Sequence, residues 1–160
     1  MTDAIKPLLI FAYGNPSRGD DALGPLLLDR LMAQADASRI EFISDFQLQI
    51  EYALELAQRE QVWFIDAAVI DGSAFSWSLL QPLKDHSYSS HALSPAALLH
   101  VYQTITGLPP PPAYLLSIQA ISFELGADLS TTAAANLDKA WAFLQQKLLD
   151  NGMPNSANLK

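Results

Sequence analysis

The sequence predicts an α/β fold in three layers, with a central, mostly parallel, five-stranded twisted sheet and helices on both faces. Two observations lead to this expectation. Short apolar segments typical of buried strands alternate along the chain with segments of helical periodicity. In addition, half of the 160 residues are hydrophobic and only 16% are charged, as in a packed globular domain. Continuous apolar strands indicate a sheet that helices cover on both sides.

Each element has its own local signal. The first strand, PLLIFAY, ends at the turn residues Gly14, Asn15 and Pro16. The following helix has leucines four residues apart, which form one apolar face. Ser94 and Pro95 are typical of a helix start, and Gly107 of a helix end. Strands are expected over 7–13, 39–44, 61–66, 75–80 and 113–120, and helices over 21–34, 50–57, 94–105 and 130–149.

The chain contains no internal repeat and no linker between domains. We therefore expect one domain over residues 1–150 and a flexible C-terminal tail over 151–160. No basic leader precedes the first apolar segment and no segment approaches the roughly 18 apolar residues of a membrane span, so a cytoplasmic monomer without membrane contacts is expected.

Composition excludes several kinds of chemistry. The chain has no cysteine, which excludes a disulfide framework, a cysteine nucleophile and thiolate metal ligands. Its net charge of −8 argues against binding to nucleic acid. The sequence also lacks a Gly-x-Ser-x-Gly elbow, a His-Glu-x-x-His helix and the Asp-Thr/Ser-Gly loops of aspartic proteases.

The loop between the first strand and the first helix, YGNPSRGDD, carries two adjacent acids, Asp20 and Asp21. Acids at a helix start have an ordinary explanation, because one can cap free N–H groups and the helix dipole favours both. The loop has neither the GxGxxG spacing of a dinucleotide site nor the GK[ST] of a P-loop. Either a structural or a ligand role therefore stays open for this pair.

Further candidates lie where other predicted strands end. Asp66 closes the strand QVWFID, and Asp45 closes RIEFISD. Ligands of parallel sheets bind at the carboxyl ends of the strands, although each acid could equally cap a turn. His91 lies just before a predicted helix, and a lone histidine is usually structural, so it becomes informative only together with the acids.

Taken together, Asp21, Asp66 and His91 would offer two carboxylates and one imidazole at one edge of the sheet. Oxygen and nitrogen donors without thiolate suit a divalent ion such as Ni²⁺, Zn²⁺ or Fe²⁺. Three protein ligands leave coordination positions open for a substrate. The residues alone thus suggest a metal site without defining its reaction.

At this point the sequence resembles a known family. FAYGNPSRGDDALGP is similar to the N-terminal signature of the hydrogenase maturation proteases, WFIDAAV to their strand-three motif and SSHALSP to their histidine motif. The resemblance covers residues 7–148, and it places Asp21, Asp66 and His91 on the metal ligands of the family. Ala22 departs from the glycine that many members carry.

The resemblance implies an endopeptidase that removes the C-terminal extension of a nickel–iron hydrogenase large-subunit precursor after nickel has been loaded. Nickel would then be presented by the substrate and recognised by the three ligands. The metal could activate the water or only dock the substrate, and Asp21 or Asp66 could act as a base. A non-catalytic nickel-sensing chaperone and a small-molecule metallohydrolase are the alternatives.

Four other residues are expected to contact the substrate. Asn15 and Arg18 lie in the first loop, where turn and solvent-exposed roles are equally compatible with the sequence. The segment SDFQLQIEYALEL resembles one found in a branch of the same family and places Asp45 and Gln47 at matching positions. The resemblance to that branch implies a soluble, NAD-linked hydrogenase as the partner.

Overall fold

The computed structural model describes residues 4–84 and 93–153 of the chain. Five strands form its sheet: β1 (Leu8–Tyr13), β2 (Ile40–Asp45), β3 (Gln61–Ala68), β4 (Phe75–Leu79) and β5 (Ala113–Gln119). Three α-helices and two 3₁₀ helices accompany it: η1 (Gly19–Ala22), α1 (Leu23–Gln34), η2 (Ile50–Leu56), α2 (Pro95–Thr106) and α3 (Thr131–Asp150).

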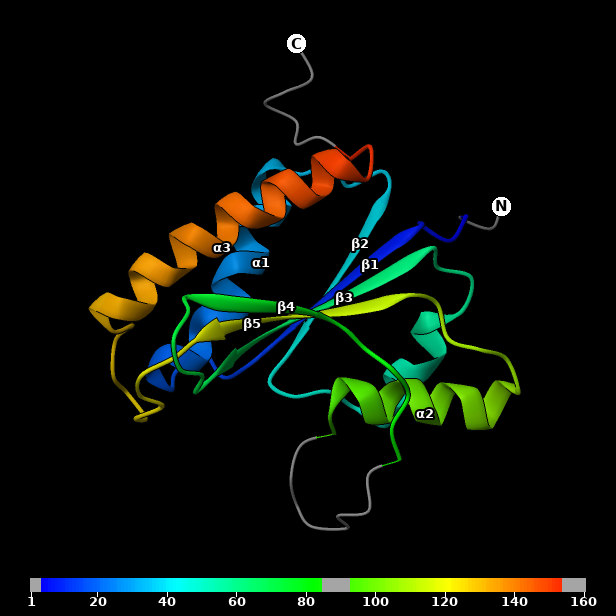
Figure 1. Ribbon diagram of the computed structural model, residues 1–160, viewed down its shortest axis with the longest axis horizontal. Coiled ribbons are helices and arrows are strands. Elements are labelled where there is room, and N and C mark those ends of the chain that lie inside the picture. The colour runs from blue at the N-terminus through cyan, green and yellow to red at the C-terminus, as the bar shows by residue number, and fades with distance from the viewer. Residues whose placement is uncertain (1–3, 85–92, 154–160) are drawn as a thin grey trace.

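The sheet has the order β2-β1-β3-β5-β4, and only β4 runs antiparallel to its neighbour. Helices α1 and α3 cover one face of the sheet, whereas α2 and η2 cover the other (Figure 1). This architecture confirms the predicted three-layer α/β fold with its mostly parallel sheet.

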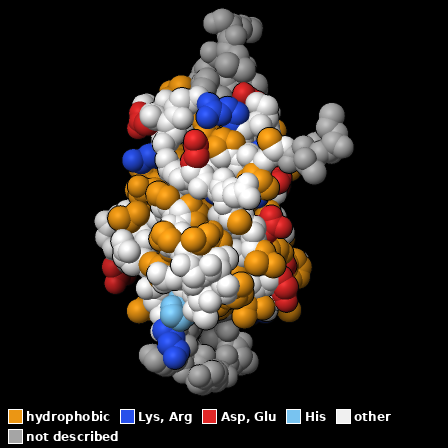
Figure 2. All heavy atoms as spheres, turned by 90° about the vertical axis from the view of Figure 1, so that its right-hand side faces the viewer, with side chains coloured by type: hydrophobic (Ala, Val, Ile, Leu, Met, Phe, Trp, Pro, Cys, Tyr) orange, Lys and Arg blue, Asp and Glu red, His pale blue; other side chains and the backbone are white. Residues whose placement is uncertain are grey.

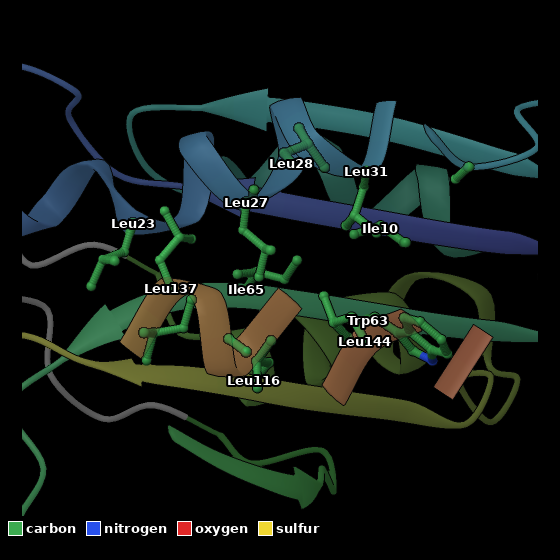
Figure 3. Packing of buried hydrophobic residues seen from close by; sticks show 14 of the residues in the cluster. Ile10, Leu23, Leu27, Leu28, Leu31, Trp63, Ile65, Leu116, Leu137 and Leu144 are labelled. Carbon is green, nitrogen blue, oxygen red and sulfur yellow. The ribbon is translucent and has the colours of Figure 1, made fainter. Parts of the chain in front are cut away.

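Alternate residues of β1 supply the two cores. Leu8, Ile10 and Ala12 pack toward α1 and α3, while Leu9 and Phe11 pack toward α2 and η2. Figure 3 shows how leucines of α1 and α3 meet over the first of these faces. All five of these β1 residues are buried. Because the strand is covered on both faces, its sequence is one continuous apolar segment.

Local signals set the helix ends as the sequence predicts. The Ser94 and Ser130 side chains accept hydrogen bonds from the backbone N–H groups of Ala97 and Ala133, which caps α2 and α3. Gly107 ends α2 with a left-handed φ of 70°. One predicted helix differs in type, because residues 50–56 form a 3₁₀ helix, which is common in such short segments. The helix predicted over 21–34 is α-helical over Leu23–Gln34 and follows the 3₁₀ turn η1.

The end of α3 continues into packed structure. Asn151 accepts a hydrogen bond from Gln61 at 2.7 Å, and Met153 is buried with its N–H bonded to Leu148. Residues 151–153 of the expected flexible tail are therefore held against β3 and α3, and 154–160 lie outside the described residues. Within the described ranges, no helix combines the length and the apolar character that crossing a membrane requires.

Candidate functional site

The candidate site lies at the carboxyl ends of β1 and β3, where the loop after β1 turns into η1. Gly14 makes this turn possible: its φ is +147°, and an added Cβ would lie 2.1 Å from the backbone oxygen of Asp21. Gly24, at the start of α1, is also confined, because an added Cβ would lie 2.9 Å from the carbonyl oxygen of Tyr13 and 3.1 Å from that of Ile65. The two glycines allow η1 and the start of α1 to lie directly on the strand ends.

Asp21 projects from η1 and is half-buried. Its Oδ2 accepts a hydrogen bond from the backbone N–H of Asn15 at 2.7 Å. The Asn15 side chain in turn accepts one from the N–H of Ser17 at 2.9 Å, an arrangement that fixes the turn. The loop therefore holds one oxygen of Asp21, and no donor among the described residues bonds the other.

Asp66 is on β3, the direct neighbour of β1, and β1 is the strand that leads into this loop. The Tyr13 hydroxyl donates a hydrogen bond to Oδ2 of Asp66 at 3.0 Å. Oδ1 of Asp66 is buried and has no hydrogen-bond partner in the described part of the chain. A buried carboxylate oxygen without a donor is costly, so it marks a place where a ligand would be favourable.

The surroundings of Asp66 shift its ionisation. Burial raises the pKa of its carboxyl to about 6; the hydroxyls of Tyr13 and Ser117 offset part of that rise, and the neighbouring Asp21 carboxylate adds to it. Burial and the same Asp66 raise the pKa of Tyr13 well above its usual value, so the phenol remains a donor.

Asp20, in contrast, has a structural role. It is 0% exposed, and its carboxylate accepts hydrogen bonds from the backbone N–H groups of Ile121, Ser122 and Ser130 and from the Ser130 hydroxyl. Burial alone would raise its pKa, but these four bonds hold the pKa below its usual value. Asp20 thus fastens the loop between β5 and α3 to the loop after β1.

His91 lies outside the described residues, so its place relative to the two carboxylates stays a prediction. Within residues 4–84 and 93–153, no three His, Cys, Asp or Glu side chains converge as a metal site would require. The donors that are described still fit a divalent ion, because the orphaned Oδ1 of Asp66 and the Asp21 carboxylate are oxygen ligands at one strand edge.

The predicted substrate contacts divide into two kinds. Asp45 is engaged locally: its Oδ1 accepts from the N–H of Phe46, and its Oδ2 from the hydroxyl of Tyr52, whose pKa this bond raises to about 12. Asn15 likewise shapes its own turn. Arg18 and Gln47 are exposed, on the loops after β1 and β2 respectively.

Two residues of the site escape prediction from the sequence. Tyr13 and Ser117 are ordinary strand residues by sequence, yet both hydroxyls lie beside Asp66. The register provides the missing signal, since Ser117 is the cross-strand partner of Asp66 and the preceding pair, Ala12 and Ile65, puts Tyr13 next to Asp66.

The opposite edge of the sheet has a different character. Figure 2 shows this face, where hydrophobic side chains gather in the middle. A groove there is lined by Leu79, Leu80, Gln81, Pro82, Gln103, Pro109–Pro112 and Tyr114. Among the described residues, no carboxylate or imidazole lines this groove, so Asp21 and Asp66 are not part of it.

Solved structures share the fold of this chain. The hydrogenase maturating endopeptidase HybD from Escherichia coli superposes with a TM-score of 0.75 over 92% of this chain and 95% of its own, at 20% sequence identity. The chain has the fold of the hydrogenase maturation endopeptidases. A solution structure of an endopeptidase from Escherichia coli gives a TM-score of 0.71 over 92% of this chain and 95% of its own, at 21% identity.

A third structure with this fold is the [NiFe] hydrogenase maturation protease HycI from Thermococcus kodakarensis. It superposes with a TM-score of 0.66 at 21% identity and covers 88% of this chain and 90% of its own. No protein-family model and no curated protein matches the chain by sequence. The likeness to these endopeptidases is thus one of fold.

Proposed function

We propose that this chain is an endopeptidase that removes the C-terminal extension from the nickel-loaded precursor of a nickel–iron hydrogenase large subunit. The observation that carries the proposal is the orphaned, buried Oδ1 of Asp66 beside the Asp21 carboxylate, in a fold shared with solved maturation endopeptidases. This fold alone would be compatible with many functions; the pair of carboxylates at its carboxyl edge supports this one.

The proposed role of Asp21, Asp66 and His91 is to bind nickel that the precursor presents. Two carboxylates and one imidazole leave coordination positions for ligands from the substrate, so a precursor without nickel would lack this contact. Specificity for the loaded precursor then follows from the difference in binding free energy between the two forms.

Cleavage requires a group that activates water near the scissile bond. A carboxylate oxygen without a hydrogen-bond donor can accept a proton from water or ligate a metal that polarises it. Oδ1 of Asp66 has no donor among the described residues. The exposed side chains of Arg18 and Gln47 would contact the substrate from the loops on either side. Asn15 and Asp45 would shape those loops.

The decisive experiment incubates the purified chain with nickel-loaded and nickel-free large-subunit precursor and measures the mass of the precursor. We expect loss of a C-terminal peptide from the loaded form only. Asp66→Asn and His91→Ala should each lower the cleavage rate at least about 100-fold, whereas Asp29→Asn, on the exposed side of α1, should leave it unchanged.

Other outcomes would identify the alternatives. Binding of the loaded precursor without any change of mass would indicate a nickel-sensing chaperone. Hydrolysis of small esters or amides, with no effect on either precursor, would indicate a small-molecule metallohydrolase.

A further inference from the structure

We propose that Tyr13 is a positioning residue that holds Asp66 so that Oδ1 alone is presented to nickel. This inference rests on the proposed function and adds a residue that the sequence alone did not indicate. It concerns which oxygen of the carboxylate is available, and therefore how tightly the ion is held.

Packing in the sheet holds the Tyr13 phenol beside Asp66. Tyr13 is the last residue of β1, and its ring packs against the core beneath α2 and η2, next to β3. Its hydroxyl donates to Oδ2 of Asp66 at 3.0 Å across 53 residues of sequence. Because the ring is fixed by packing, the hydroxyl reaches Asp66 from a constant direction.

The hydrogen bond from Tyr13 orients the Asp66 carboxylate. A hydrogen bond to Oδ2 restrains rotation of the Asp66 carboxylate, while Oδ1 is buried and has no donor within residues 4–84 and 93–153. Carboxylates that ligate metals are commonly oriented by such outer hydrogen bonds, and loss of one typically weakens metal binding or activity about 10- to 100-fold.

Asp21 repeats this arrangement. The N–H of Asn15 donates to its Oδ2 at 2.7 Å, and no described group donates to its Oδ1. Each carboxylate therefore has one oxygen held by the protein and one left open. The donor is backbone for Asp21 but a side chain for Asp66, so only the second can be removed by substitution.

Tyr52 provides a matched control on the same edge of the sheet. Its hydroxyl also donates to a carboxylate, that of Asp45, at 2.5 Å. Both oxygens of Asp45 already accept hydrogen bonds from its own segment. Tyr52→Phe thus removes the same kind of bond outside the proposed nickel ligands.

The experiment titrates NiCl₂ into the full chain without precursor and measures heat of binding for wild type, Tyr13→Phe and Tyr52→Phe. We expect Tyr13→Phe to weaken nickel affinity at least about tenfold and Tyr52→Phe to change it less than twofold. Equal affinity of Tyr13→Phe and wild type would overturn the inference. Urea unfolding checks that Tyr13→Phe, which keeps the packed ring, remains folded.

A second measurement does not depend on nickel affinity. The crystal structure of metal-free Tyr13→Phe should show the Asp66 carboxylate turned about χ2, and the absorption spectrum of Co²⁺-loaded variant should differ from that of Co²⁺-loaded wild type. An unchanged carboxylate and spectrum would contradict a positioning role. If wild type neither binds nickel nor cleaves loaded precursor, it is the proposed function that fails.

Discussion

Asp20 and Asp66 are two acidic residues at the same edge of the sheet. Both are withdrawn from solvent, but they differ in their hydrogen bonding and in the direction of their pKa shift. Asp20 accepts four hydrogen bonds, and its pKa is lowered. Asp66 has one oxygen without a partner among the described residues, and its pKa is raised. The first carboxylate is used to join loops, whereas the second is kept available for a ligand.

The comparison also separates two neighbours in sequence. Asp20 and Asp21 are adjacent, yet Asp20 points toward the loop before α3 and Asp21 toward the loop after β1. A pair of acids at a helix start is therefore not one feature. One member stabilises the fold, and the other lies beside Asp66, where the candidate ligands are.

The largest expected effect concerns Asp20. Asp20→Asn places an amide N–H₂ among donors that need acceptors, so the free energy of unfolding at pH 7 should fall by about 4 kcal/mol. Urea unfolding measures this change, with Asp29→Asn as an exposed control that should change it by less than about 0.5 kcal/mol. Equal stability of Asp20→Asn and wild type would show that the four hydrogen bonds contribute little.

Asp66→Asn should raise the free energy of unfolding at pH 7, whereas Asp20→Asn should lower it. The pKa of Asp66 is about 6 in the folded chain, above the roughly 3.9 of an unfolded aspartate, so the native state binds more protons between these values. Wild type should lose stability as the pH rises from about 4 to 6, and the variant should not. At pH 7 the variant should be more stable by up to about 3 kcal/mol. A difference that does not change with pH would contradict the raised pKa.

Smaller changes in unfolding free energy are expected at the two serines that cap α2 and α3. Ser94 and Ser130 cap α2 and α3 in the same way, but Ser130 also donates to Asp20 at 2.8 Å. Ser94→Ala should cost about 1 kcal/mol of unfolding free energy, and Ser130→Ala about 2 kcal/mol. In an Asp20→Asn background, the additional cost of Ser130→Ala should shrink toward that of Ser94→Ala. Costs that stay unchanged in that background would mean that the two residues are not coupled.

The fold could be predicted because its signals are local. Ser94, Ser130 and Gly107 mark helix ends within a few residues of sequence, and the residues of β1 alternate between two cores. The expected helix at 50–57 is a 3₁₀ helix instead, because a segment so short has little α-helical cooperativity. What depends on neighbouring residues was accessible from the sequence.

The site could be predicted only in part for the same reason. A carboxylate at the end of a buried strand drew attention to Asp66, but its donor Tyr13 is 53 residues away and comes from another strand. The partners of Asp20 are more than 100 residues away, in the loop before α3. Such assignments require the strand order β1-β3-β5, which no local pattern specifies.

In the proposed site, Asp66 and Asp21 present open oxygens, together with His91, to one nickel ion. The most direct measurement is anomalous diffraction at the nickel absorption edge from crystals of the chain soaked in NiCl₂, with Asp66→Asn crystals as control. We expect a single peak in wild type that contacts Oδ1 of Asp66, the Asp21 carboxylate and a ring nitrogen of His91, and no such peak in the variant. A peak bound elsewhere, or the same peak in both crystals, would contradict it.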